Sequence, residues 1–325
     1  MKTFILQEEA YRERMLYEVE PYLEKRKKEM WAERRRGKKI HCVVYSPNHP
    51  EKVVVLSHGY TETAEKYKEI AYYFVKEGYR VYLPEHCGHG YSYRLTTDPS
   101  LVHLDHYERY VEDLLYISRI ASRQNPKLPL YLYGHSMGGG IAAAALSRAS
   151  YLYRRAILSS PMIRPQTEGV PWPITCMISG LNCGVGRRGY YVIGQRPYHG
   201  LGKFENSSSG SKERFDYYQA KRSREPLYQL NAASYGWLYS AVWLNRYLKR
   251  TAYKTIQTPF ILFQSEQDHM VSKKEQRRFV ERLNKYRPGT AKLIEVPGTK
   301  HEIFNSDERV LQEYWKKVFD FFEEW

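Results

Sequence analysis

The chain has 325 residues, 42% of them hydrophobic, which is enough for one large domain with an insertion or for two domains. Its 51 Lys and Arg residues against 36 Asp and Glu residues give a net charge of +15, which favours contact with anionic surfaces. The cysteines are too few for a disulfide scaffold, and the absence of a C-x-x-C pair argues against a zinc knuckle. They are Cys42, Cys87, Cys176 and Cys183. We therefore expect a protein of the reducing cytoplasm.

Neither a signal peptide nor a membrane-spanning helix is expected. The apolar run within residues 1–9 is too short for a signal peptide. The longest uncharged stretch, residues 169–186, is interrupted by Pro171, Pro173 and Asn182. It therefore falls short of the roughly 20 apolar residues that a spanning helix needs.

Residues 5–36 carry hydrophobic side chains among charges at helical spacing, so residues 1–38 are predicted to be a long N-terminal helical extension. Nine basic residues fall between Lys25 and Lys39, offset only by Glu29 and Glu33. Two interpretations are open for them. They form either a solvated helix end or a peripheral contact with an anionic membrane on its inner face, where each cation contributes about 1 kcal/mol at best.

From Lys39 onward, predicted strands and helices alternate. Such alternation calls for a mostly parallel sheet covered by helices on both faces. The predicted strands cover residues 39–45, 53–56, 79–83, 130–134, 155–159, 260–264 and 291–296. The predicted helices cover residues 64–76, 106–123, 136–150, 273–286 and 307–323.

The alternation stops at Met162 and returns near residue 252. The stretch between holds prolines, many glycines, the serine tract 207–211 and the tryptophans Trp172, Trp237 and Trp243. We interpret residues 162–251 as a cap inserted over the site. The α/β core then has two parts, residues 39–161 and 252–325.

A G-x-S-x-G pattern, formed by Gly134, Ser136 and Gly138, stands between a predicted strand and a predicted helix. In a nucleophile elbow of this kind, the serine occupies a strained turn and its hydroxyl projects above the sheet. The glycines are needed because a Cβ would collide with neighbouring backbone. The alternative is a glycine-rich turn that only packs a helix on a strand.

A serine hydroxyl needs a base, and the base needs an orienting acid. Asp268 and His301 each follow a predicted strand, so both side chains should meet Ser136 at one edge of the sheet. Asp268 could otherwise be a helix N-terminal acid, and His301 an ordinary loop histidine. Glu266 is a neighbouring competitor, two residues nearer the strand.

The oxyanion of the reaction would be held by two backbone N–H groups, those of Met137 and Tyr60. Losing one such donor typically costs about 3 kcal/mol of transition-state stabilisation. We interpret His58 as a brace for the turn and not as a base. A metal site at His86, Cys87 and His89 is disfavoured, because two glycines are interleaved and no second cluster exists.

The whole chain resembles the lysophospholipase L2 branch of the α/β-hydrolases, close to the monoacylglycerol lipases. Both groups share the turn at residues 134–139. Further motifs specific to the first group lie at residues 97–103, 110–114, 189–194 and 301–303. The resemblance implies a membrane-associated enzyme that releases a fatty acid from lysophospholipids. It also implies Ser136, Asp268 and His301 as the triad, with no metal ion and no organic cofactor.

The chain departs from the family in one turn, usually Asp-x-Arg-Gly-x-Gly, which here reads Glu85-His-Cys-Gly-His-Gly90. We expect this change to alter a supporting hydrogen bond and not the reacting groups. The cap sequence differs from the family more than the core does, so the resemblance says least about the substrate. Its aromatic residues could line an acyl slot or hold a choline headgroup, or simply pack the cap's own core.

Other functions stay open on the sequence. Monoacylglycerol lipase and general carboxylesterase activities use the same chemistry. Proline-type aminopeptidases share the fold but usually carry a tryptophan where Met137 stands. A non-catalytic binding protein often lacks a triad member, and all three are present here. No nucleic-acid partner is expected, since no reader motif appears and the cations cluster near the N-terminus.

Overall fold

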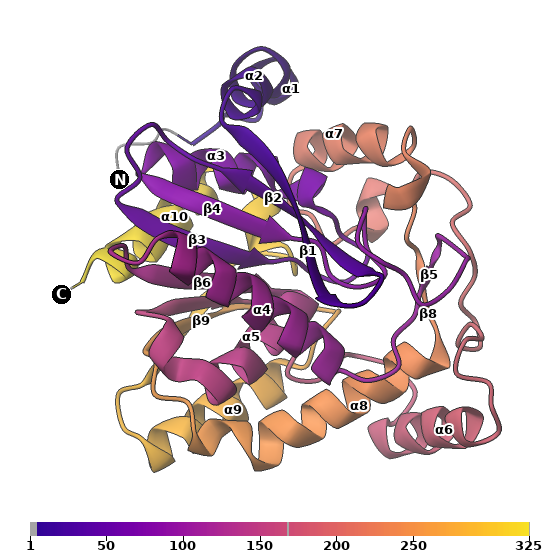
Figure 1. The fold of residues 1–325 in the computed structure, drawn as a ribbon. Helices are drawn as coiled ribbons and strands as arrows, with labels where there is room; N and C mark the ends of the chain where they lie inside the picture. Colours follow the sequence, from indigo (N-terminus) through magenta and orange to yellow (C-terminus); the bar gives the residue numbers. More distant parts are fainter. Residues whose placement is uncertain (1–4, 168, 325) are drawn as a thin grey trace.

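The computed structural model of the chain describes residues 5–167 and 169–324, which fold around one mostly parallel sheet (Figure 1). The strand order in this eight-stranded sheet is β1-β2-β4-β3-β6-β7-β9-β10, and only β2 pairs antiparallel with its neighbours. The strands are β1 (Lys27–Arg35), β2 (Lys38–Tyr45), β3 (Lys52–Ser57), β4 (Tyr79–Pro84), β6 (Leu130–His135), β7 (Ala156–Ser159), β9 (Phe260–Ser265) and β10 (Ala291–Val296). A separate two-stranded ladder joins β5 (Leu101–Val102) to β8 (Ala232–Ala233).

Helices cover both faces of the sheet, as the alternation predicted. They are α1 (Tyr11–Arg14), α2 (Glu20–Glu24), α3 (Lys68–Lys76), α4 (Glu108–Gln124), α5 (Ser136–Ala149), α6 (Trp172–Gly184), α7 (Lys212–Arg222), α8 (Tyr235–Arg250), α9 (Lys273–Tyr286) and α10 (Glu308–Glu323). In β3, Val53 and Val55 pack toward α4 and α5, whereas Val54 and Leu56 pack toward α3 and α10. The strand is apolar throughout because both of its faces are buried.

The predicted N-terminal helix is only half correct. Residues 11–24 are helical, with a π-helical turn at Met15–Val19 between α1 and α2, and they bury Tyr11, Val19 and Leu23. The remainder of the predicted helix is wrong, because Lys27–Arg35 forms β1, an antiparallel edge strand paired with β2. The basic residues from Lys25 to Lys39 therefore lie along a β-hairpin.

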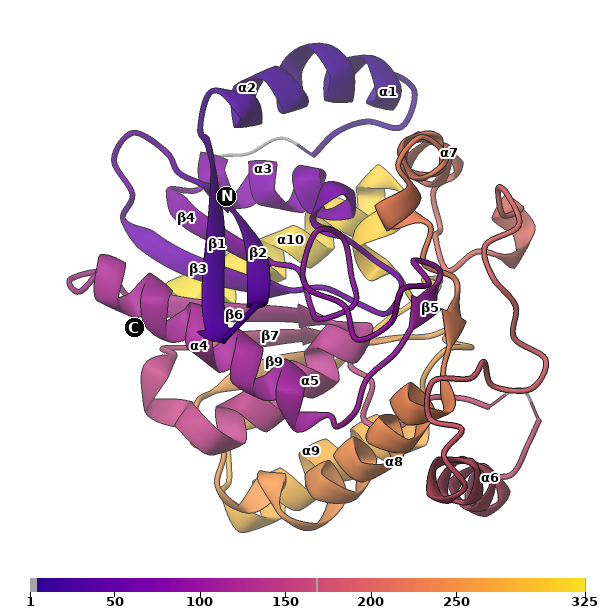
Figure 2. The ribbon, with the colours of Figure 1, turned by 45° about the vertical axis from the view of Figure 1, so that its right-hand side comes forward.

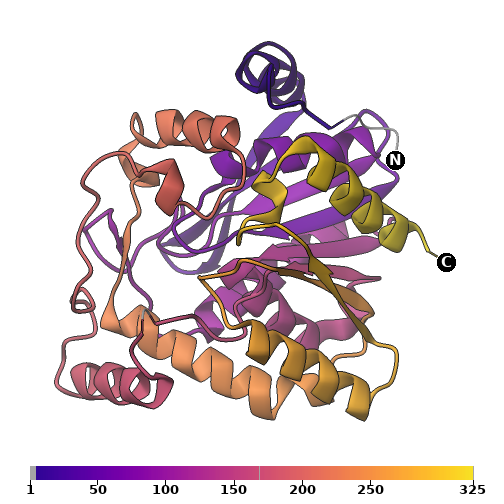
Figure 3. The same ribbon diagram turned by 180° about the vertical axis from the view of Figure 1, so that it is seen from behind.

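Residues 162–167 and 169–251 lie past the carboxyl ends of the parallel strands (Figure 2). Helices α6 and α7 stand apart from each other there, and an extended chain connects them (Figure 2). The third helix of the segment, α8, returns to the sheet and packs Ala241, Leu244 and Leu248 into the same core as α5. Seen from behind, α10 covers the face opposite to α9 (Figure 3).

Candidate active site

Ser136 lies in the turn between β6 and α5, and it adopts the left-handed backbone conformation, with φ of +53°. This conformation is unusual for a residue with a side chain and is held by the surrounding backbone. A Cβ on Gly138 would lie 2.1 Å from the carbonyl oxygen of Ser57, and one on Gly134 would lie 2.8 Å from that of Gly138. The two glycines of the pattern are thus required by close backbone approach.

The structure brings the three predicted side chains together. His301 Nε2 lies 2.7 Å from Ser136 Oγ, and His301 Nδ1 lies 2.8 Å from Asp268 Oδ2. Asp268 follows β9 and His301 follows β10, so strand ends position both residues. All three are buried, with 4–8% of each residue exposed. Such a chain of contacts can carry a proton from the hydroxyl to the imidazole.

Asp268 is oriented as well as paired. Its Oδ1 accepts hydrogen bonds from the Met270 and Val271 N–H groups at 2.8 and 3.0 Å. Burial alone would raise the pKa of Asp268, but His301 and these amides outweigh it and hold the pKa below its usual value. Glu266, the competing acid, is exposed and instead accepts a hydrogen bond from the Gly298 N–H.

The turn after β3 is braced from within. His58 Nδ1 lies 2.9 Å from the Gly59 carbonyl oxygen, and His58 Nε2 accepts the His86 N–H, so this histidine supports the turn as predicted. The Gly59 N–H donates to Glu62 Oε2 at 2.6 Å. The next N–H in the turn is that of Tyr60. Met137 is the second residue of α5, where backbone N–H groups lack intrahelical acceptors.

The divergent turn after β4 supports its neighbours through Glu85. This buried carboxylate accepts hydrogen bonds from the Ala64 and Tyr91 N–H groups and contacts His41 Nδ1 at 2.8 Å. Burial lowers the pKa values of His86 and His89 well below normal. Within the described residues, no three His, Cys, Asp or Glu side chains are grouped as a metal ion would need.

Two aromatic rings, called the aromatic cover below, lie next to the residue that follows Ser136. The rings of Tyr60 and Trp237 lie 4.5 Å apart, and the Trp237 indole N–H points at Met137 Sδ at 3.4 Å. Trp237 is in the first turn of α8, within the segment predicted as a cap. Trp172 is farther out on α6, half-buried, with the Arg164 guanidinium over its ring.

Four polar residues around the site, buried or half-buried, were missed by the sequence analysis. Glu62, Lys66 and Glu302 form a chain of ion pairs, and the His135 ring lies 4.9 Å from that of His301. Glu302 and His135 adjoin predicted site residues in the sequence. Nothing in the sequence pattern, however, indicates that Lys66 reaches a residue 236 positions away.

A serine in a strained strand-to-helix turn contacts a histidine, and this histidine contacts an aspartate, all above a parallel sheet. This arrangement defines a hydrolase of the α/β-hydrolase fold. The model of the family described as serine aminopeptidase, S33, matches residues 48–308, and the chain belongs to this family. The protein is a serine ester hydrolase of the lysophospholipase and monoacylglycerol lipase group.

Similar curated proteins cover most of the chain. The monoacylglycerol lipase of Mycolicibacterium smegmatis is 28% identical over 85% of this chain and 90% of that protein. The probable lysophospholipase L2 of Haemophilus influenzae is 26% identical over 97% of both chains. A soluble variant of the Saccharomyces cerevisiae monoglyceride lipase superposes with a TM-score of 0.75. It is 17% identical, covers 94% and 97% of the two chains, and so shows the fold alone.

Proposed function

We propose that Ser136, His301 and Asp268 form a catalytic triad that hydrolyses esters through an acyl-enzyme. Ser136 Oγ attacks the ester carbonyl carbon while His301 Nε2 takes the hydroxyl proton. His301 then returns this proton to the leaving alcohol, and water, activated by the same imidazole, releases the acid. Asp268 fixes the imidazole tautomer. The contact of 2.7 Å between Ser136 Oγ and His301 Nε2 carries the proposal.

The oxyanion is proposed to bind the N–H groups of Met137 and Tyr60. Two observations support this assignment. Met137 follows the nucleophile at the first turn of α5, where the helix presents free donors. The Gly59 N–H is already engaged by Glu62, which leaves the Tyr60 N–H as the next donor in the turn.

We propose a lysophospholipid as the substrate, with release of its fatty acid. The proposal is supported by the likeness to proteins named lysophospholipase L2 over nearly the whole chain. The aromatic cover of Tyr60 and Trp237 offers an apolar wall next to Met137 for an acyl chain. Monoacylglycerol is the second candidate, supported by the equally strong likeness to the mycobacterial lipase.

Residues 162–251 are proposed to act as a cap over this site, and a membrane contact is proposed for its outer helix. Helix α6 lies in an uncharged stretch and exposes Ile174, Met177 and Leu181, spaced three and four residues apart on one face. The exposed Arg35 and Arg36 on the β1–β2 hairpin add positive charge that an anionic surface would attract. None of the helices in residues 5–167 and 169–324 has the length and apolarity to span a bilayer.

The proposed function is tested with the Ser136→Ala variant and a lipid panel. We expect the variant to lose at least about 10⁴-fold in kcat with its fold intact, because no nucleophile remains. The panel compares lysophospholipids, monoacylglycerols and short soluble esters at matched concentration. Preference for lysophospholipids is expected. Preference for short soluble esters would replace the lipid assignment by a general carboxylesterase, and activity in Ser136→Ala would refute the triad.

An aminoacyl amide belongs in the same panel, because the family is described as serine aminopeptidase, S33. We expect no cleavage of this amide. The Met137 thioether sulfur receives the Trp237 N–H, so the residue after the nucleophile contributes to the aromatic cover. Efficient amide cleavage with weak ester hydrolysis would reassign the protein as a peptidase.

A further inference from the structure

Lys66 is a largely buried lysine that the proposed chemistry does not use. It lies in the 3-10 turn Ala64–Tyr67 before α3, and 10% of its side chain is exposed. Its Nζ donates to Glu62 Oε1 at 2.8 Å and to Glu302 Oε1 at 2.6 Å. Glu62 belongs to the turn after β3 and Glu302 directly follows His301. One ammonium group therefore joins two loops of the proposed site.

Glu62 carries this contact into the turn that holds the proposed oxyanion donor. Its Oε2 accepts the Gly59 N–H at 2.6 Å and the Tyr67 hydroxyl at 2.7 Å. Burial would raise the pKa of Glu62, but Lys66 and the other donors lower it to about 2, so the carboxylate is charged at neutral pH. Thr61, inside the turn, has a φ of +57°, a conformation that persists only where contacts hold it.

Glu302 carries the contact to the histidine loop and to the inserted segment. Its Oε2 accepts a hydrogen bond from Asn305 Nδ2 at 2.7 Å, and its N–H donates to the Ser208 carbonyl oxygen at 3.0 Å. The serine tract 207–211 makes two further hydrogen bonds to this loop, in which the Gly210 and Ser211 N–H groups donate to the Asn305 carbonyl oxygen. The backbone beside His301 is thus anchored from two directions.

Without Lys66, two carboxylates would face each other in a buried space. Glu62 and Glu302 have 5% and 13% of their side chains exposed, so little water is available to screen their repulsion. The turn after β3 and the loop after β10 would then move apart. In an active site, a displacement of about 1 Å can cost on the order of 100-fold in rate.

We propose that Lys66 is a positioning residue for the ester hydrolysis. By binding Glu62 and Glu302 together, it fixes the Tyr60 N–H relative to His301 Nε2. Lys66 acts through these two carboxylates and not on the substrate. This inference rests on the proposed function, because it assigns a role only if the oxyanion forms between these two loops.

The test compares Lys66→Met with Lys66→Arg, using a soluble short-chain ester. The active-site concentration is measured by fluorophosphonate labelling of Ser136. Lys66→Met keeps the chain length and removes the charge. We expect kcat per labelled site to fall about 10- to 100-fold with KM within about twofold, because positioning is lost and binding is not. Lys66→Arg, which can reach both carboxylates, should restore kcat to within about threefold of wild type.

Lys68→Met is the matched control. Lys68 lies two residues along the chain and pairs with Glu65 at 2.7 Å and Glu20 at 3.5 Å, away from both loops. Its kcat should match wild type. Glu302→Gln provides a second route should Lys66→Met fold poorly. It weakens the same bridge from the other end, so kcat should again fall with little change in KM.

The outcomes separate the two proposals. An active wild-type enzyme whose Lys66→Met or Glu302→Gln variants keep kcat per labelled site at the Lys68→Met level would overturn the role of Lys66 alone. That role would equally be overturned if Lys66→Arg were as slow as Lys66→Met. A wild-type enzyme without ester hydrolysis, or an active Ser136→Ala variant, would overturn the proposed function and the inference with it.

Discussion

The His135 ring lies 4.9 Å from that of the proposed base, His301, and its Nδ1 is buried without a partner among the described residues. Burial lowers the pKa of His135 to about 3, far below the value near 6.5 of an exposed histidine. At neutral pH the ring is therefore uncharged. Because His135 is uncharged, it does not repel the positive charge that forms on His301 when His301 accepts the serine proton.

This low pKa makes the folding stability depend on pH. Between pH 6.5 and pH 5, the unfolded chain binds a proton at His135 and the folded chain does not, so stability falls as the pH falls. We expect the free energy of unfolding of His135→Phe to fall by about 1.6 kcal/mol less than that of the wild-type protein over this interval. Urea unfolding of both proteins at both pH values measures this effect. A change in packing caused by the substitution is the same at the two pH values, so it cancels when the change with pH is compared.

The exposed His49 supplies the control. His49→Phe should show the same loss of stability between pH 6.5 and pH 5 as the wild-type protein. If His135→Phe behaved like His49→Phe, His135 would not remain neutral in the folded protein, and its assignment as an uncharged neighbour of the base would be wrong.

At the scale of elements, the central strands and the helices between them followed from their apolar patterns. Strand β1 did not, because only Ala32 in it is buried and no alternation is visible. What makes residues 27–35 a strand is their pairing with β2, in which Lys27 lies opposite Tyr45. Such a long-range contact leaves no periodic mark in the sequence, and the charged, helix-compatible residues favoured the wrong prediction.

In the proposed site, too, some residues could be predicted from the sequence and others depend on contacts between distant parts of the chain. Ser136, Asp268 and His301 could be placed because each stands just beyond a recognisable strand, and parallel strands end at one edge. Lys66 and Glu302 could not, since their meeting depends on how far two loops extend beyond that edge. The serine tract 207–211 was noted in the sequence only as part of the inserted segment, yet its backbone hydrogen-bonds to the histidine loop.

Helix α6 carries the prediction for membrane contact. The Met177 and Leu181 side chains are 57% and 62% exposed on one face, and burying them in a bilayer interface would favour binding. We expect Met177→Glu combined with Leu181→Glu to weaken binding to anionic vesicles about tenfold or more, since carboxylates resist transfer into the interface. Vesicle sedimentation measures binding, and hydrolysis of a soluble ester should stay within about twofold of wild type.

Tyr151→Glu, which adds one carboxylate away from α6, is the control. Tyr151 is 84% exposed and follows α5, at the end of the sheet opposite to the site. This variant should bind vesicles like the wild-type protein. Equal loss in both variants would mean that added negative charge, and not the apolar face of α6, weakens binding.

At the scale of the whole molecule, the N-terminal segment joins the sheet to the inserted segment. Glu8 accepts a hydrogen bond from the Ser211 hydroxyl, and Glu20 accepts one from the Tyr217 hydroxyl of α7. Deleting residues 1–36 would therefore remove β1 and the contacts of α7 along with the basic residues. Charge reversal at Arg35 and Arg36 tests the membrane contribution of the hairpin without this damage.

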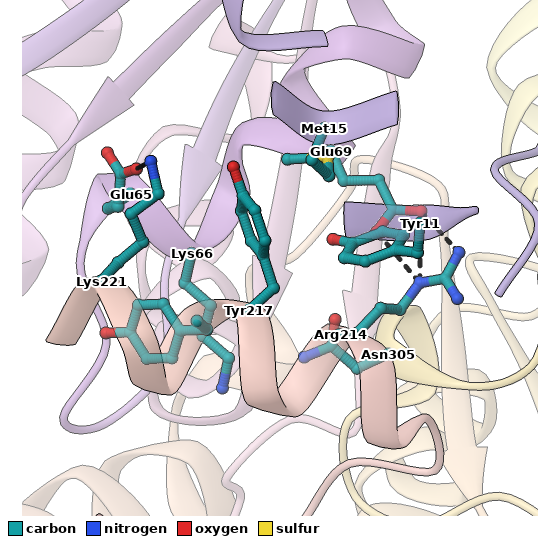
Figure 4. A pocket seen from close by; sticks show the side chains of 10 residues that line it. Tyr11, Met15, Glu65, Lys66, Glu69, Arg214, Tyr217, Lys221 and Asn305 are labelled. Atoms are coloured by element: carbon teal, nitrogen blue, oxygen red, sulfur yellow. Dashed lines mark hydrogen bonds and ion pairs between the residues drawn. The ribbon is translucent and has the colours of Figure 1, made fainter. Parts of the chain in front are cut away.

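A further long-range link is the buried ion pair between Arg214 of α7 and Glu69 of α3 (Figure 4). The Arg214 guanidinium is fully buried, donates also to the Leu6 carbonyl oxygen at 2.8 Å, and lies over the Tyr11 ring. The Arg214 side chain of α7 thus contacts both α3 and the N-terminal segment. The N-terminal segment, α3 and α7 are therefore tied together at this one guanidinium.

We expect Arg214→Met to lower the free energy of unfolding by about 3–5 kcal/mol, because it leaves the Glu69 carboxylate buried without a counter-charge. Adding Glu69→Leu should recover much of this loss, since no unpaired charge remains. Chemical unfolding of the three proteins measures the series. Lys212→Met, which breaks the exposed pair of Lys212 with Asp216 on the same helix, should leave the unfolding midpoint unchanged. A double variant no more stable than Arg214→Met would mean that the guanidinium stabilises the fold through Leu6 and Tyr11, and not by compensating the charge of Glu69.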